Sequence, residues 1–227
     1  MPSVRAIPDP RAAGSITKSK VGVGSVLIAM LALCIQAAPV GAASASFGAK
    51  LDNTSQPSNA EGGRLCDEES SIPSGSACSW VATSAYRNAG HQRAPKSGTI
   101  GQVSLVSCVA GSFRLQLARV RPAQDSAKVV RNGPVIRYAA DPRELDDDQD
   151  TYCGGEDGTD YRVQTFPVNV AVSAGEYIAI KAKSTGTLYC SGDSGVLLYA
   201  PPLAVGGSFA SATDDTSCLM LVRLTYK

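Results

Sequence analysis

Six cysteines follow an apolar N-terminal stretch, and this arrangement constrains the chain more than any other feature of its sequence. A seventh cysteine, Cys34, lies inside the apolar stretch itself. An even set of cysteines behind an export leader is typical of an extracellular domain stabilised by disulfides. The sequence disfavours a zinc site, because it has no C-x-x-C pair and its single histidine is His91. The cysteines predicted to form disulfides are Cys66, Cys78, Cys108, Cys153, Cys190 and Cys218.

Residues 1–45 have the composition of a secretory signal peptide. Four Lys or Arg residues precede an apolar run over residues 21–38, and small residues follow it up to Ala45. A basic start, an apolar centre and a small-residue end are the marks of an export signal. We therefore expect cleavage after Ala45 and a secreted mature protein. An uncleaved membrane anchor is the alternative, since the run is nearly long enough to span a bilayer.

The length and the charge of the remaining chain narrow its partners. The 182 residues after the leader are the size of one domain. They hold 17 Lys or Arg and 19 Asp or Glu, so the mature chain is close to neutral. Such a balance favours neither a phosphate backbone nor an anionic membrane. We expect no nucleic-acid partner, no membrane association after cleavage, and an extracellular protein or glycan as the ligand.

Two segments are expected in the mature chain. Residues 46–65 are polar and lack periodicity, which predicts a flexible leader. Residues 66–227 contain many short runs in which apolar and polar residues alternate, as where Arg114 and Gln116 alternate with apolar neighbours. Frequent short strands separated by Gly and Pro predict an all-β domain, an antiparallel β-sandwich of jelly-roll or immunoglobulin-like type. Strands are predicted over Ser79–Arg87, Ile100–Val109, Ser112–Val120, Lys128–Tyr138 (with a turn or bulge at Asn132-Gly133-Pro134), Tyr161–Val172, Glu176–Lys183, Leu188–Cys190, Val196–Tyr199 and Cys218–Tyr226.

Several of these strands carry longer motifs. Thr165–Ile180 reads TFPVNVAVSAGEYIAI, and Val196–Leu203 reads VLLYAPPL. With Gly98–Val106, Phe113–Arg119 and Leu219–Tyr226, they make the chain resemble secreted single-domain β-sandwich proteins of actinobacterial type that have no assigned activity. The resemblance extends over a bit more than half of the chain. It implies the sandwich fold and supplies no catalytic residues.

The string Gly-Asp-Ser-Gly at residues 192–195 matches the nucleophile loop of chymotrypsin-like serine proteases. In a serine hydrolase of this kind, Ser194 is the nucleophile, His91 the base and Asp141 the third member of the triad. The surroundings differ from that family, because His91 lies in a polar loop and Val196 follows where a second glycine belongs. Gly, Asp and Ser also dominate turns, and a turn between two strands is the interpretation that we favour.

An acidic segment over residues 141–160 is a candidate calcium site. Its carboxylates recur at every second residue and continue beyond Cys153, where a disulfide can hold the loop. Calcium prefers several oxygen ligands on a flexible loop, and weak sites suffice outside the cell. The alternative is a solvated acidic loop without metal. The candidate ligands are Asp146, Asp148, Asp150, Asp157 and Asp160.

Aromatic side chains supply the last candidate surface. A strip of exposed aromatics on one face is the feature by which a carbohydrate-binding module stacks sugars, whereas in most β-sandwiches such residues pack in the core. Aromatics make up only 6% of the chain, which disfavours a dedicated sugar binder. The residues concerned are Tyr138, Tyr152, Tyr161, Tyr189, Tyr199 and Trp80.

The sequence thus predicts a secreted, non-enzymatic domain that acts in extracellular or cell-surface recognition or as a structural component. The 141–160 segment, with or without calcium, is the predicted binding surface. A serine hydrolase and a carbohydrate-binding module are the two alternatives.

Overall fold

The structure, a computed structural model, describes most of the chain from residue 45 onward. All described residues belong to one compact unit, Ala42–Lys227. The expected signal peptide lies outside the described residues, apart from Ala45. The described stretches are residues 45–51, 64–66, 72–83, 91–107, 109–121, 123, 125–140, 162–190, 195–216 and 218–227.

The described residues form fifteen β-strands and no α-helix, which confirms the all-β prediction. No helix among them is long and apolar enough to cross a membrane. The strands are β1 (Ser46–Gly48), β2 (Arg64–Leu65), β3 (Cys78–Ala82), β4 (Gly98–Leu105), β5 (Gly111–Arg121), β6 (Ser126–Tyr138), β7 (Gln164–Val172), β8 (Tyr177–Ala182), β9 (Ser184–Thr185), β10 (Leu188–Cys190), β11 (Val196–Tyr199), β12 (Ala210–Ser211), β13 (Asp214–Thr216), β14 (Cys218–Met220) and β15 (Val222–Tyr226).

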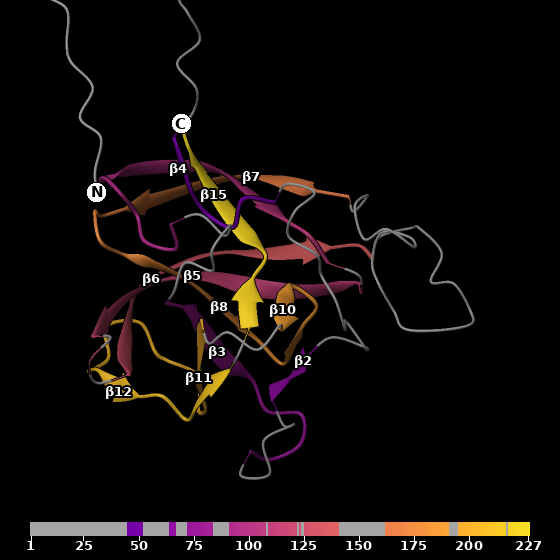
Figure 1. Ribbon diagram of the computed structural model, residues 1–227, viewed down its shortest axis with the longest axis vertical. Helices are drawn as coiled ribbons and strands as arrows, with labels where there is room; N and C mark the ends of the chain where they lie inside the picture. The colour runs from indigo at the N-terminus through magenta and orange to yellow at the C-terminus, as the bar shows by residue number, and fades with distance from the viewer. Residues whose placement is uncertain are drawn as a thin grey trace, which may run out of the picture. The chain divides into compact units, whose positions relative to one another are not determined.

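Two antiparallel sheets form the sandwich (Figure 1). One has four strands in the order β1-β15-β4-β7, and the other has seven in the order β12-β6-β5-β8-β3-β11-β13 and curves into a half-barrel. In Figure 1, β4, β15 and β7 lie above the band formed by β6, β5 and β8. Two short pairs, β10 with β14 and β2 with β9, complete the ladders.

The main core lies between the two sheets. Alternate residues of β4 and β15 meet alternate residues of β3, β5 and β8, and Trp80 on β3 is fully buried among them. Each Å² of apolar surface that is removed from water stabilises the fold by about 25 cal/mol. Such a core is therefore the dominant favourable term in folding. The alternation read from the sequence therefore reports which side chains face inward. Phe113, Leu115 and Leu117 of β5 all lie in this core, as the pattern predicts.

A second apolar cluster lies on the opposite face of the seven-stranded sheet. Val81, Ala118 and Val129 on this face are buried, because the segment that follows β11 covers them. Leu203 of that segment packs into the cluster, and the amide of Gly206 donates a hydrogen bond to the carbonyl of Val129 at 3.0 Å. One part of this face is thus covered by the chain, and the rest is exposed.

The bulge predicted at Asn132-Gly133-Pro134 is present within β6. Arg114 pairs with Val135 and Gln116 with Asn132, so two residues of β6 oppose Leu115 alone. A side chain on Gly133 would approach the Leu115 side chain to 3.0 Å, and glycine avoids this crowding. The bulge turns the rest of β6 without ending it.

The N-terminal limit of the sandwich differs from the sequence prediction. Residues 46–48, assigned to a flexible leader, form β1 and pair with β15. Phe47, Ala49 and Leu51 are buried. Their apolar side chains alternate over too short a run to be distinguished from polar spacer by periodicity, so the pattern alone did not reveal them.

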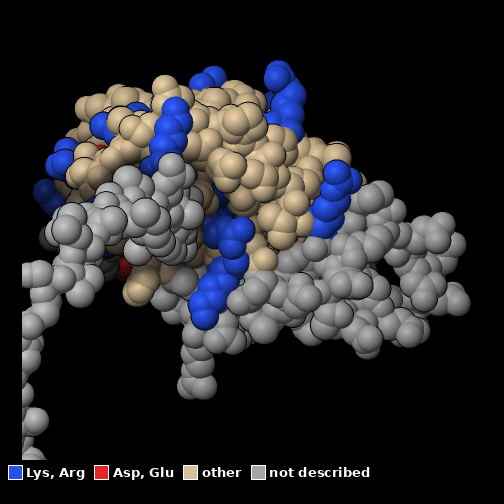
Figure 2. All heavy atoms as spheres, turned by 90° about the horizontal axis from the view of Figure 1, so that it is seen from above, with Lys and Arg blue, Asp and Glu red and all other residues tan. Residues whose placement is uncertain are grey.

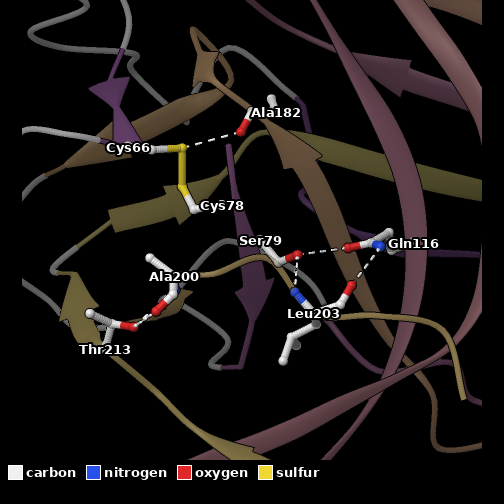
Figure 3. The surroundings of a disulfide bond; sticks show 8 residues. All are labelled: Cys66, Cys78, Ser79, Gln116, Ala182, Ala200, Leu203 and Thr213. Atoms are coloured by element: carbon white, nitrogen blue, oxygen red, sulfur yellow. Dashed lines mark hydrogen bonds between the residues drawn. A yellow bond between two sulfur atoms is a disulfide. The ribbon is translucent and has the colours of Figure 1, made fainter. Parts of the chain in front are cut away.

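One disulfide joins two described cysteines, Cys66 and Cys78, twelve residues apart (Figure 3). Cys218 is also disulfide-bonded. Cys108 and Cys153, and the side chain of Cys190, lie outside the described residues. The expected stapling of the domain is therefore confirmed for the first pair, which ties the start of β3 to the segment before it.

A side-chain clasp closes the stem of the acidic segment between β6 and β7. The Gln164 side chain accepts a hydrogen bond from the amide of Ala139 at 2.9 Å and donates one to the carbonyl of Ala139 at 2.8 Å. The chain therefore leaves β6 and enters β7 at nearly the same point.

Candidate functional site

The members of the predicted serine-hydrolase triad are only partly placed. His91 is exposed, and its carbonyl accepts a hydrogen bond from the amide of Gly48 at 2.6 Å. Ser194 and Asp141 lie outside the described residues. The triad therefore stays a prediction.

The chain neighbours of Ser194 and His91 lie near the same end of β3. The carbonyl of Gly195 accepts a hydrogen bond from the amide of Thr83, just beyond β3. The carbonyl of Gln92 accepts one from the amide of Ile178, on the strand paired with β3. The segments that contain His91 and Ser194 are about a hundred residues apart in the sequence, and nothing in the sequence indicated that they lie near the same strand end.

All five candidate calcium ligands, Asp146, Asp148, Asp150, Asp157 and Asp160, lie outside the described residues. Within the described part of the chain, no group of three or more His, Cys, Asp or Glu side chains is arranged to hold a metal ion. The calcium site accordingly remains a prediction for the 141–160 segment.

The three candidate aromatics whose side chains the structure describes do not lie on the surface. Trp80, Tyr138 and Tyr199 are all buried, and burial raises the pKa of both tyrosine hydroxyls above its usual range. Tyr152 and Tyr161, and the side chain of Tyr189, lie outside the described residues. For the three placed residues, the core interpretation is the correct one.

Charge is distributed unevenly along the chain, and the whole-chain balance conceals this. The described residues include 15 Lys or Arg but only four Asp or Glu. Figure 2 shows separate Lys and Arg side chains over one face of the molecule and scarcely any Asp or Glu among its coloured atoms. The described part of the sandwich therefore carries excess positive charge, although the mature chain as a whole is close to neutral.

The cations gather on three neighbouring strands. Strands β5, β6 and β8 together carry seven Lys or Arg and no Asp or Glu. On the exposed part of the outer sheet face, Arg114 of β5 lies directly opposite Lys181 of β8. Arg137 of β6 lies opposite Ser112, one position along the same face from Arg114. We call Arg114, Arg137 and Lys181 the outer cationic row.

The side chains of the outer cationic row are open to solvent. Arg114 and Arg137 are exposed, and Lys181 is half-buried. The Arg114 guanidinium donates one hydrogen bond, at 3.3 Å, to the carbonyl of Gly133. Within the described part of the chain, none of the three has an ion-pair partner. Like charges directly opposite each other destabilise a sheet, so folding alone does not favour this placement.

A single ion pair joins described residues, and it is structural. The Arg131 guanidinium lies 3.7 Å from the buried Glu176 carboxylate, which also accepts a hydrogen bond from the amide of Ser173 at 2.9 Å. Arg131 additionally donates to the carbonyl of Ala171 on β7. Through these contacts the Arg131 side chain links β6 to the end of β7 and to the turn that follows it.

The described acids other than Glu176 lie at one corner of the seven-stranded sheet. Burial, followed by the charges of Asp125 and Asp214, raises the pKa of the Asp215 carboxyl above its usual value. These carboxylates repel one another, and within the described part of the chain none of them forms an ion pair with a cation of the outer row.

An apolar pocket of about 430 Å³ lies beside the disulfide. One wall follows Ile72 and Pro73 before β3, and the other follows Ala200 and Pro201 after β11. Thr213 fixes the second wall by accepting a hydrogen bond from the Ala200 amide at 2.9 Å and donating one to its carbonyl at 3.2 Å (Figure 3). The described lining holds no charged group. The pocket can therefore make apolar contacts with a ligand, but its described lining offers no acid, base or ion-pair partner.

Sequence reasoning did not identify the outer cationic row. The signal was present in the sequence, because the predicted strands Ser112–Val120 and Lys128–Tyr138 together contain five Lys or Arg and no acid. It becomes visible only when charge is counted strand by strand instead of over the whole chain.

Comparison with known proteins finds no match: no family model, no curated protein and no solved structure is similar to this chain.

Proposed function

We propose that the protein is an exported, non-enzymatic β-sandwich that binds an acidic glycan through the outer cationic row. The observation that carries the proposal is the cross-strand pair Arg114 and Lys181, two like charges held opposite each other on an exposed face. A polymer bearing carboxylates relieves this repulsion when it binds. This proposal places the binding surface on the seven-stranded sheet, whereas the sequence alone pointed to the acidic 141–160 segment.

The geometry of the row suits an extended polymer. Neighbouring strands of a sheet lie about 4.8 Å apart, so β6, β5 and β8 present cations from three adjacent strands over about 10 Å. Val135, which is 40% exposed, lies beside Arg114 and adds an apolar contact. The near-neutral mature chain does not favour nucleic acid, whose affinity rests on neutralising many phosphates. A carboxylated glycan needs fewer charges and is met outside the cell.

The test is binding to polygalacturonate, measured by isothermal titration at low and at physiological salt. We expect affinity that falls as salt rises, because exposed charges are screened. The double variant Arg114→Gln/Lys181→Gln should lose about tenfold or more, since each charged hydrogen bond contributes about 1.5–3 kcal/mol.

The matched control is Lys50→Gln/Lys227→Gln. It removes the same charge from exposed residues that belong to the other part of the sandwich, where Lys227 donates to the Asn169 side chain at 2.9 Å. The control should bind as the wild type does. Equal losses in both double variants would show that net charge matters and the row does not. Absence of any salt-sensitive binding would overturn the proposal.

A further inference from the structure

A second group of cations surrounds one aromatic ring at the end of the β5–β6 hairpin. The Arg121 guanidinium carbon lies 3.8 Å from the centroid of the Phe209 ring, and the Lys128 ammonium lies 5.0 Å from it. Phe209 comes just before β12, which pairs with β6. The ring is thus held at the sheet edge beside both cations.

A third cation completes the group. Arg119 of β5 lies directly opposite Lys128 of β6, and it is exposed. Like Arg114 and Lys181 between β5 and β8, these two like charges lie directly opposite each other on paired strands. Between described residues, none of the three cations forms an ion pair. The acid nearest in sequence, Asp125, raises the pKa of Tyr199 and Asp215 through its charge, so it lies toward those residues instead.

The ring determines how the cations are presented. A guanidinium stacked on an aromatic face keeps its N–H groups in a fixed plane, directed outward at the ring edge. This fork matches the two oxygens of a carboxylate, a sulfate or a phosphate. Because its guanidinium is already ordered by Phe209, Arg121 loses less side-chain entropy when it binds such a group.

We propose that Arg119, Arg121 and Lys128 form an oxyanion site, with Phe209 as the positioning residue. The inference rests on the proposed function, because it assigns an anionic group of the polymer to this second place. Arg119 is five residues from Arg114 along β5, about 16 Å at 3.3 Å per residue. Because successive side chains of a strand point to opposite faces, this odd spacing places the oxyanion site on the other face of the sheet from Arg114. The two sites therefore contact separate stretches of the polymer.

The first experiment measures the ring without changing charge. Phe209→Leu should weaken binding of polygalacturonate roughly two- to fivefold, the range expected for an exposed cation–π contact of about 0.5–1 kcal/mol. Phe209→Tyr keeps the ring and should restore binding. The control Phe166→Leu removes a half-buried aromatic from β7 and should leave affinity unchanged.

The second experiment observes the site directly and identifies the group that it holds. Titration with polygalacturonate, dextran sulfate and polyphosphate is followed by the NMR signal of the Arg121 side-chain Nε–H. A shift that saturates, and that is reduced in Arg119→Gln, supports the site. Comparison of the three titrations shows whether carboxylate, sulfate or phosphate is preferred.

The two proposals fail in different ways. If Phe209→Leu and Arg119→Gln bind as the wild type does while Arg114→Gln/Lys181→Gln loses affinity, the oxyanion site is wrong and the outer cationic row stands. If only the hairpin variants lose affinity, the row is wrong. An Arg121 signal that no polymer shifts overturns the inference outright.

Discussion

Ser79 donates a buried hydrogen bond of 2.9 Å to the side-chain oxygen of Gln116 across the seven-stranded sheet (Figure 3). The same hydroxyl accepts one from the amide of Leu203 at 3.1 Å, and Gln116 donates to the carbonyl of Leu203 at 3.4 Å. Two side chains of the sheet thereby provide partners for the backbone of the segment that covers them. The covered part of the outer face is fastened by polar contacts as well as by apolar packing.

We expect Ser79→Ala to lower the free energy of unfolding by about 1–3 kcal/mol, because a buried oxygen of Gln116 and the amide of Leu203 lose their partner. Urea unfolding measures the change. Ser112→Ala, at an exposed site of β5, serves as control and should stay within about 0.5 kcal/mol of wild type. An equally small effect at Ser79 would show that packing alone holds the covering segment.

Replacing the disulfide, Cys66→Ala/Cys78→Ala, should destabilise the protein by about 3 kcal/mol. The bond closes a loop of twelve residues, and loops near this length lose about that much chain entropy in the unfolded state. Thermal unfolding without reductant gives the measurement. A midpoint equal to that of the wild type would contradict the expectation.

Asp215 should make stability decrease as pH rises above the ordinary carboxyl range. Burial and the neighbouring charges of Asp125 and Asp214 raise its folded pKa above the unfolded value of 3.8. The folded state therefore holds a proton more tightly, and stability falls as pH rises from the unfolded pKa through the folded one. Asp215→Asn should raise the thermal midpoint slightly at pH 7 and leave it unchanged near pH 3. The opposite order of the two effects would refute this assignment.

Calcium binding by the acidic segment is tested by thermal unfolding with calcium and with a chelator. A site occupied at tenfold its Kd stabilises the fold by about 1.4 kcal/mol. The variant Asp146→Asn/Asp148→Asn/Asp150→Asn should abolish the shift, while Asp214→Asn should keep it. If neither calcium nor the chelator changes the thermal midpoint, the calcium-site prediction is wrong.

A fluorophosphonate probe tests the serine-hydrolase alternative. Because we interpret Gly-Asp-Ser-Gly as a turn, we expect no labelling of the wild type. Labelling that disappears in both Ser194→Ala and His91→Ala would establish the enzyme instead. The approach of Gly195 and Gln92 to the same end of β3 makes this experiment worthwhile.

Much of the strand pattern was predictable because alternation reports burial directly. The strands at Leu188–Cys190 and Val196–Tyr199 have the predicted bounds. Of the run predicted over Ser79–Arg87, the structure describes residues 79–83, and the strand there, β3, ends at Ala82. Local composition predicts that a strand is present better than it predicts the residue at which the strand ends.

The remainder depends on contacts between distant segments. Gln116 is polar and lies on the face predicted to be outside, yet it is buried because Leu203 covers it. No local pattern shows where a segment after β11 will cross the sheet. The pairing of Arg114 with Lys181 is hidden for the same reason, since only the order of strands brings β5 and β8 together.

The clasp between Ala139 and Gln164 has a consequence for the way the protein can change. Two hydrogen bonds close the stem where β6 ends and β7 begins, so the strand register is set before the chain enters residues 141–161. We therefore expect the pairing of β6 and β7 with their neighbours to tolerate insertions and deletions in the segment between them, much as a disulfide at the base of a loop would allow. This stem is the place where we would graft foreign peptides of different length to engineer new specificity.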